Sequence, residues 1–419
     1  MPHIGIVFCV IGWYHGTCMT SVFPFTQHTL ETSPTVAINS RVAEMRARGE
    51  RMYNLSVGEV LLDTPMVIQE AAMEAMRSGK TRYAPASGVP ELRQAAADWM
   101  NANYGTSYTK DETMVTCGGK FALYALAQLC IRPGDEVLIV SPYWVSYVSI
   151  VTLFGGIPRV IQTVEQDGWK MTEETLRAEC TPKTKILFFN NGGNPTGVLY
   201  TREEMEVLLG VAQEASVFVI SDEVYSGLTY DHHAFVSAGS FPAYRDRVAV
   251  VQSCSKHFAM TGWRVGFLFA DRACIDRVTA LQTQSTTGTS TVSQWAALAA
   301  IQNENDIIPS IRQTMEKRRN TFVQRWEQVF SVSIVPPFAG LYCFLPFRAF
   351  GISETDSLSF CMRALEEAHV ALVPGIAFGK EGYVRCSFGE REDVLVEGIN
   401  TLAEWLKTEY PTGSSQTGL

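Results

Sequence analysis

The stretch that decides the fold is residues 185–222, which read KILFFNNGGNPTGVLYTREEMEVLLGVAQEASVFVISD. Two short apolar runs, at 186–189 and 217–220, enclose a helical pattern at 203–215. Apolar runs without alternating polar residues are typical of parallel strands that are buried on both faces. The stretch therefore predicts a strand–helix–strand unit of a parallel sheet.

The same alternation extends to both sides of this stretch, from about residue 65 to residue 305. Strands are predicted at 114–117, 136–140, 159–163, 185–190, 217–221, 247–253 and 265–270, and helices at 120–131, 143–153 and 203–215. This order predicts a doubly wound α/β domain with a mostly parallel sheet. After residue 305 the pattern becomes that of a smaller α+β domain. Its predicted helices are 307–330, 354–368 and 393–407, and its strands are 333–335, 341–345, 371–373 and 383–387.

A chain of 419 residues is longer than the roughly 250–300 residues at which a single core stops growing, so two domains are expected. We assign residues 64–305 to the large domain, and residues 19–63 with 306–419 to the small domain. Residues 1–18 are predicted to be a disordered extension or an artefact of start-site choice, because Met19 can also initiate. A cleaved signal is the weaker alternative, because no basic residue precedes the apolar run at 5–14.

Charge and cysteine content exclude several classes of protein. The net charge is −9 and the longest basic run is three residues, at 317–319, so nucleic-acid binding is not expected. The ten cysteines contain no C-x-x-C pair and the seven histidines are dispersed, so no metal site is expected. Free thiols favour a reducing compartment such as the cytoplasm. No apolar run reaches the length of a membrane span.

Polar or glycine-containing segments follow five of the predicted strands, where ligands of open α/β sheets bind. In chain order they contain Gly119 and Lys120, then Trp144, then Asn194, then Asp222 and Tyr225, and finally Ser253, Ser255 and Lys256. Taken alone, each segment is explained by a turn, a helix cap, a core residue or a surface lysine. Five of them at the ends of strands of one sheet favour a shared site.

The surroundings of Lys256 indicate which ligand this site binds. Two serines flank the lysine closely and Arg264 follows eight positions later, a set that suits a phosphate dianion. The helix that opens at Gly119 and Lys120 offers free N–H groups to the same phosphate. An imine-forming lysine beside a phosphate site is what pyridoxal 5'-phosphate requires.

The remaining strand-end residues fit the ring of that cofactor. A carboxylate such as Asp222 keeps a pyridine nitrogen protonated, which makes the ring a better electron sink. Tyr225 and Asn194 can form hydrogen bonds with the phenolic oxygen, and Trp144 can stack on the ring.

These motifs resemble those of the fold-type I, class I aminotransferases. The resemblance is strongest to the bacterial aspartate aminotransferase branch that includes prephenate-active members, and it extends from about residue 33 to residue 406. The stretches that carry it are TRYAPASGVPELR (81–93), GGKFALYAL (118–126), PGDEVLIVSPYWVSY (133–147), NPTG (194–197), SDEVY (221–225), SCSKHFAMTGWRVG (253–266), QSTTGTSTVSQWA (284–296) and VRCSFG (384–389). The resemblance implies the pyridoxal-phosphate-dependent transferase fold.

The resemblance also implies a role for each matching residue. Lys256 would be the Schiff-base lysine, Asp222 would pair with the pyridine nitrogen, and Asn194 and Tyr225 would contact the phenolic oxygen. The phosphate would be held by Ser253, Ser255 and Arg264, with help from the backbone of Gly119 and Lys120. Tyr83 would reach the phosphate in a neighbouring subunit, which implies a homodimer with shared active sites.

On the substrate side, Arg385 would grip the α-carboxylate as a bidentate fork. Gly58 would allow that carboxylate to approach closely, and Lys120 would contact the distal carboxylate of a dicarboxylic substrate. Trp144 and Asn194 would line the same space.

The function implied is transfer of an amino group from an L-amino acid, with aspartate expected, to a 2-oxo acid, with 2-oxoglutarate expected, by a ping-pong Schiff-base mechanism. Two alternatives stay open: a preference for aromatic amino acids, alanine or prephenate, and a C–S β-lyase of the same fold. A transcription regulator would need a basic N-terminal domain, and only about 35 residues precede the match. A catalytically dead relative is not expected, because Lys256, Asp222, Arg264 and Arg385 are all present.

The chain departs from the family pattern in two places. Gly192 and Gly193 stand where proline and asparagine are usual, which predicts a more flexible loop before Asn194. Residues 58–62 read GEVLL instead of the usual GEPDF. Because this segment borders the substrate entrance, the change predicts a shifted substrate preference.

Overall fold

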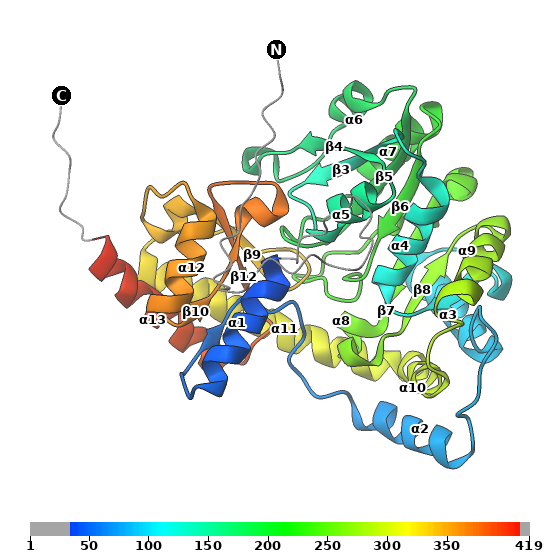
Figure 1. Cartoon of the computed structure of the whole chain (residues 1–419), viewed down its shortest axis with the longest axis horizontal. Coiled ribbons are helices and arrows are strands. Elements are labelled where there is room, and N and C mark those ends of the chain that lie inside the picture. Colours follow the sequence, from blue (N-terminus) through cyan, green and yellow to red (C-terminus); the bar gives the residue numbers. More distant parts are fainter. Residues whose placement is uncertain (1–33, 411–419) are drawn as a thin grey trace, which may run out of the picture. The chain divides into compact units, whose positions relative to one another are not determined.

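A seven-stranded sheet lies at the centre of the large predicted domain (Figure 1). In spatial order its strands are β2 (Thr113–Thr116), β8 (Gly266–Phe269), β7 (Val248–Ser253), β6 (Phe218–Asp222), β5 (Thr184–Asn190), β3 (Glu136–Ser141) and β4 (Ile157–Gln162). Only β8 runs antiparallel to its neighbours. The doubly wound, mostly parallel sheet is thus confirmed, and each strand lies within two residues of its predicted limits.

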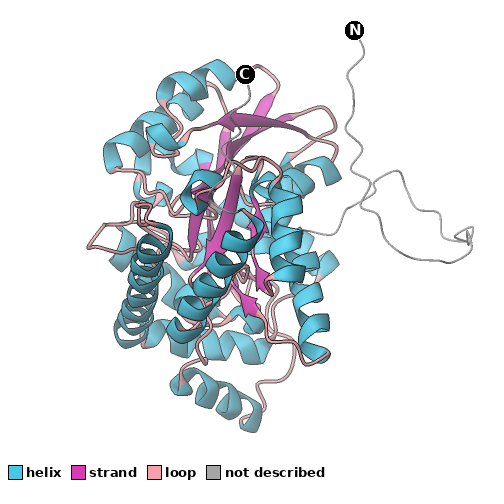
Figure 2. Cartoon of the chain, turned by 90° about the vertical axis from the view of Figure 1, so that its left-hand side faces the viewer, coloured by secondary structure: helices cyan, strands magenta, loops and turns pink. Residues whose placement is uncertain are grey.

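Helices cover both faces of this sheet, as Figure 2 shows. The helices in this part of the chain are α2 (Met66–Arg77), which packs against α10 (Thr291–Gln302), and α3 (Pro90–Tyr104), α4 (Gly119–Cys130), α5 (Ser146–Leu153), α6 (Glu173–Glu179), α7 (Arg202–Glu214), α8 (Cys254–His257) and α9 (Arg272–Ser285). Alternate residues of β5 enter different cores because successive strand residues face opposite sides. Ile186 and Phe188 lie in the core with residues of α4, α5 and α9, whereas Leu187 and Phe189 lie in the core with residues of α3, α7 and α10.

Smaller sheets form in the flanking parts of the chain. The strands β11 (Val373–Pro374), β12 (Tyr383–Ser387) and β9 (Tyr342–Pro346) make an antiparallel sheet, and β1 (Tyr53–Asn54) pairs in parallel with β10 (Val370–Ala371). The accompanying helices are α1 (Pro34–Ala47), α11 (Glu304–Phe330), α12 (Ser357–Glu367) and α13 (Glu392–Glu409).

The strand predicted at 333–335 is wrong, because that segment has no strand partner in the described chain. Two prolines follow it directly and remove backbone donors, and Val335 is 77% exposed. The strand predicted at 371–373 is divided between β10 and β11.

The computed structural model describes residues 34–410. The extension predicted at 1–18 and the tail at 411–419 therefore lie outside the described residues, as do residues 19–33. The division into residues 64–305 and the two flanking segments stays a prediction. Within the described range, every helix is too short or too polar to cross a membrane.

Candidate active site

The carboxyl ends of β5, β6 and β7 bring the predicted strand-end residues together. Asn190 lies opposite Asp222 in the register of β5 and β6, and Asp222 lies opposite Val251 of β7. The chain then passes through Ser253 into the short helix α8, which carries Lys256. Because these strands are parallel neighbours, their ends open onto one edge of the sheet.

Asp222 is a buried carboxyl group with one oxygen left free. Its Oδ2 accepts a hydrogen bond from the Tyr147 hydroxyl at 2.7 Å, while Oδ1 has no hydrogen-bond partner in residues 34–410. Burial raises the pKa of Asp222 to about 6, against the lowering effects of the Tyr147 bond and the charge of Lys256. A buried polar atom without a partner is costly, so Oδ1 suits a ligand that brings a proton or a positive charge.

Lys256 is held in place at two points, its backbone and the end of its side chain. The Ser253 hydroxyl caps α8 by accepting the Ser255 N–H at 3.1 Å. The Lys256 ammonium donates to the carbonyl oxygen of Gly58. The lysine is thus fixed at its backbone by the cap and at its tip by the Gly58 segment.

Several cationic and N–H groups gather at the start of α4. Gly118 precedes this helix with φ +78°, and a Cβ atom there would lie 2.5 Å from Arg264 Nη2. Burial lowers the pKa of Lys120, and the charges of Arg264 and Lys256 lower it further. The N-terminus of α4 together with the three cations Lys120, Arg264 and Lys256 is suited to bind an anion.

Hydroxyl and aromatic groups complete this region. The Ser253 hydroxyl donates to Ser255 Oγ at 2.8 Å, and the Lys120 ammonium lies 4.6 Å from the centre of the Trp144 ring. The predicted residues of the cofactor site in this part of the chain are thus brought together by the fold.

Arg385 lies in the middle of β12 and is only 2% exposed. Its Nη1 donates to Asn194 Oδ1 at 3.0 Å, and its Nη2 donates to the Ser56 carbonyl at 2.6 Å. The guanidinium lies 4.2 Å from the centre of the Tyr342 ring and 5.1 Å from that of Phe378. Burial lowers the pKa of Arg385, yet a guanidinium keeps its proton in proteins, so the site holds a positive charge.

Two tyrosines connect Arg385 with the cofactor side. The hydroxyls of Tyr225 and Tyr342 lie 3.0 Å apart and both rings are buried. A Cβ atom on Gly58 would lie 2.9 Å from the Tyr342 hydroxyl, so a larger residue would crowd this space. Tyr342 and Tyr147 are absent from the residues predicted from the sequence, because neither directly follows the carboxyl end of a strand of the large sheet.

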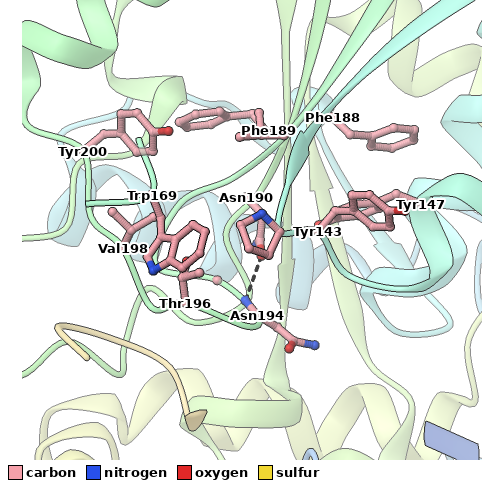
Figure 3. Close-up of a pocket in the computed structure, with 13 residues that line it drawn as sticks. Tyr143, Tyr147, Trp169, Phe188, Phe189, Asn190, Asn194, Thr196, Val198 and Tyr200 are labelled. Carbon is pink, nitrogen blue, oxygen red and sulfur yellow. Dashed lines mark hydrogen bonds between the residues drawn. The ribbon is translucent and has the colours of Figure 1, made fainter. Parts of the chain in front are cut away.

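The loop that carries Asn194 is closed by hydrogen bonds. The Gly192 N–H donates to Val198 O at 2.7 Å, and the Gly197 N–H donates to Gly193 O at 2.7 Å. The Asn194 N–H donates to Asn190 Oδ1 at 3.0 Å, which is the dashed contact in Figure 3. These bonds argue against the flexibility predicted from the two glycines.

The side chain of the predicted site residue Tyr83 points into solvent. It follows α2 in the chain and its side chain is 91% exposed. It therefore does not pack into the site of its own chain.

Comparison with known proteins identifies the family. The family described as "Aminotransferase class I and II" matches residues 50–400. The chain is 34% identical to a probable aspartate/prephenate aminotransferase of Aquifex aeolicus, over 90% of this chain and 97% of that protein. It is 35% identical to the aspartate/prephenate aminotransferase of Thermus thermophilus, again over 90% and 97%. A solved structure of aspartate aminotransferase from Thermus thermophilus with maleate superimposes with a TM-score of 0.85 at 36% identity, covering 89% of this chain and 97% of that chain.

The chain therefore belongs to the class I and II aminotransferases. It is a transaminase that acts on amino acids and 2-oxo acids, has the aspartate aminotransferase fold and uses pyridoxal 5'-phosphate. The described residues fit this cofactor. Asp222 Oδ1 is buried without a partner, as a protonated ring nitrogen requires, and the cationic start of α4 suits a phosphate.

Proposed function

We propose that the protein transfers the amino group of L-aspartate to 2-oxoglutarate in a ping-pong reaction. The observation that carries this proposal is the presence of two separate cationic points, Arg385 and Lys120. Each can bind one carboxylate of a dicarboxylic substrate. The names of the relatives, which include aspartate as a substrate, support the same choice.

When bound, pyridoxal phosphate supplies an aldehyde that condenses with amines and a ring that withdraws electrons from the substrate α-carbon. In our proposal Asp222 keeps the ring nitrogen protonated through its free Oδ1. Asn194 and Tyr225 would donate hydrogen bonds to the phenolic oxygen, and Trp144 would stack on the ring. The phosphate would be held by the side chains of Ser253, Ser255 and Arg264, with help from the backbone of Gly119 and Lys120.

Lys256 carries the chemical step. Its Nζ atom would be the amine that faces the aldehyde of the bound cofactor, and when a substrate amine takes that place, the free Nζ would remove the proton from the substrate α-carbon. The Gly58 carbonyl, which accepts from Nζ, keeps this amine at the side of the site that the substrate enters.

Arg385 positions the substrate for that proton transfer. Its buried guanidinium binds the α-carboxylate in a bidentate manner, and the rings of Tyr342 and Phe378 exclude water around it. The absence of a side chain at Gly58 leaves room for the carboxylate next to Tyr342.

We also propose a homodimer in which Tyr83 contributes to the partner's site. Tyr83 is 91% exposed, and Met66, Met73 and Met76 of α2 are exposed by 62%, 39% and 52%. An apolar set of this kind is suited to a subunit interface. Mixing Tyr83→Ala and Lys256→Ala proteins tests this, because hybrid dimers would regain one intact site. Mixtures that stay as inactive as their components would contradict shared sites.

An aromatic or prephenate-preferring transaminase is the second candidate. Leu61, Leu62 and Trp263 line a cavity of about 930 Å³ next to Glu59. The same cavity is also lined by charged residues, among them Arg318 and Arg391, so only its apolar part, Leu61, Leu62 and Trp263, favours a substrate with a ring.

The deciding experiment is the visible absorption spectrum of the purified protein before and after addition of one amino acid without an oxo acid. We expect the yellow band to disappear with L-aspartate, and Lys120→Ala to weaken this response more than it weakens the response to L-phenylalanine. A response to L-phenylalanine alone would favour the second candidate. Release of ammonia and a sulfur compound from a cysteine conjugate would favour the lyase. A protein that cannot be reconstituted with pyridoxal phosphate would contradict all three.

The cytoplasm is our proposed location. The eight cysteines in residues 34–410 are all free thiols, which suits a reducing compartment. Fractionation of cells with thiol labelling would test this, and recovery of disulfide-bonded protein from an oxidising compartment would contradict it.

A further inference from the structure

The side chain of Asn190, the last residue of β5, lies between two residues of the proposed cofactor site. Its Nδ2 donates to the backbone carbonyl of Asp222 at 2.7 Å. Its Oδ1 accepts the backbone N–H of Asn194 at 3.0 Å (Figure 3). Because one end of the amide must donate and the other must accept, these two partners fix its orientation.

Gly193 provides the space that this amide occupies. A Cβ atom on Gly193 would lie 1.5 Å from Asn190 Oδ1 and 2.0 Å from its Cγ. Unlike Gly192, whose φ is +68°, Gly193 is outside the left-handed region of the backbone. An L-residue at position 193 is thus compatible with the backbone but not with the present position of the Asn190 side chain.

The contacts continue from Asn190 to the proposed substrate site. Asn194, whose N–H is held by Asn190, accepts a hydrogen bond from Arg385 Nη1 at 3.0 Å. An unbroken series of hydrogen bonds therefore connects the Asp222 backbone with the Arg385 guanidinium. A shift of Asn190 would move the Asn194 loop relative to both.

We infer that Asn190 is a positioning residue for Asn194, and that Gly193 is needed because it leaves room for the Asn190 amide. This inference rests on the proposed role of Asn194 between cofactor and substrate. Neither Asn190 nor Gly193 touches the reacting atoms in this proposal. They act by fixing where the Asn194 amide stands relative to Asp222 and Arg385.

The neighbouring Asn191 offers a matched control. Its Nδ2 donates to Val236 O at 2.8 Å, and its Oδ1 accepts the Tyr200 N–H at 3.0 Å, so it ties the loop to the scaffold. It is fully buried, and its hydrogen bonds join no predicted site residue. Asn191→Ala should therefore lower thermal stability more than it changes binding at the site.

The experiment is a double-mutant cycle with Asn190→Ala, Gly193→Ala and the double variant, with Gly210→Ala of α7 as a neutral glycine control. For each protein we would measure the dissociation constant of pyridoxal phosphate for the cofactor-free form by fluorescence, the KM for aspartate, and the melting temperature. Each single variant should weaken cofactor binding and raise KM by roughly 5- to 10-fold, the effect of about one lost hydrogen bond. The double variant should be no worse than Asn190→Ala, because the clash is then gone.

If the fold-changes in cofactor binding and KM of the two single variants multiply in the double variant, the inference is overturned. Gly193 would then act independently of Asn190. Wild-type cofactor binding and KM in Asn190→Ala would overturn it as well. If Gly193→Ala does not fold, a double variant that folds and binds cofactor supports the inference, and a double variant that also fails overturns it. Wild-type protein that does not bind pyridoxal phosphate would instead refute the proposed function, and this inference with it.

Discussion

The two sheets of the protein place their functional residues in different ways. In the seven-stranded sheet, Asp222 is the last residue of β6, and Lys256 comes directly after β7. In the three-stranded sheet, Arg385 is the middle residue of β12 and Tyr342 is the first residue of β9. The first set is placed by the ends of parallel strands, and the second by burial of a charge against aromatic rings.

This difference indicates that the two sheets have separate roles in the proposed site. The strand ends of the large sheet supply the proposed contacts to the cofactor, and the small sheet supplies the proposed grip on the substrate carboxylate. Changes at the large sheet should therefore alter the chemistry or the cofactor pocket. Changes at the small sheet should alter substrate binding first.

The largest effect is expected for Lys256→Ala. Removal of the proposed base should lower kcat by about 10⁴-fold or more, while the cofactor still binds without a covalent bond. Single-turnover kinetics with aspartate would measure this, with Lys183→Ala of the exposed surface as control. If the variant keeps near wild-type turnover, Lys256 is not the base, and the chemical step is not carried by the large sheet.

The next largest effect is expected for Asp222→Asn, whose free energy of unfolding should change with pH differently from that of the wild type. The pKa of Asp222 is raised by burial to about 6 in the folded protein, above the value of 3.8 for an unperturbed aspartate. Between pH 4 and pH 6 the unfolded chain loses this proton and the folded protein keeps it, so the wild type loses stability as pH rises. The asparagine variant lacks this loss, and its stability relative to the wild type should rise by about 3 kcal/mol from well below pH 4 to well above pH 6.

Urea unfolding of the cofactor-free proteins at several pH values would measure this difference. The buried Glu223, whose pKa burial raises to about 7 and the charge of Asp222 raises further, has the same sign, so both proteins are compared in a Glu223→Gln background. A difference between variant and wild type that does not change with pH would show that Asp222 is ionised throughout.

A smaller effect is expected for Arg385→Lys in the three-stranded sheet. Lysine keeps the charge but loses the planar fork, so about one charge-assisted hydrogen bond to the substrate carboxylate is lost. This is worth about 2 kcal/mol, or a roughly 30-fold lower kcat/KM. Steady-state kinetics should show the change mainly in KM. A change confined to kcat would show that the small sheet contributes to the chemical step and not only to substrate binding.

The smallest effect is expected for Tyr342→Phe. The variant removes the hydroxyl that lies 3.0 Å from the Tyr225 hydroxyl but keeps the ring beside Arg385. Loss of one hydrogen bond of about 1 kcal/mol predicts a roughly 5-fold lower kcat/KM. If the variant weakens cofactor affinity by a larger factor than it raises KM, Tyr342 acts on cofactor binding and not mainly on substrate binding.

Local sequence patterns were sufficient for the central sheet and for most of the proposed cofactor site. Buried parallel strands are continuous apolar runs, and ligand residues follow them directly, so Asp222 and Lys256 were found from the sequence. Arg385 was found only through the family resemblance, because a mid-strand arginine has no distinguishing local signal.

Tyr147 and Asn190 were missed for a related reason. Tyr147 lies within a predicted helix, and its hydrogen bond to Asp222 joins residues 75 positions apart. Asn190 looks like an ordinary strand end, and only its contacts with Asp222 and Asn194 give it a role. Such partners are set by tertiary packing, which local periodicity does not encode.

The antiparallel pairing of β7 with β8 has a consequence for the proposed chemistry. Because the chain reverses, the segment between Ser253 and Gly266 leaves and re-enters the sheet at the same edge, where those two residues are paired. The Cys254 N–H also donates to Val265 O at 3.1 Å and closes the base of this loop. Short closed loops have few conformations to lose. Lys256 and Arg264 are thus carried on one closed loop, so the length of this loop limits how far apart their backbones can lie.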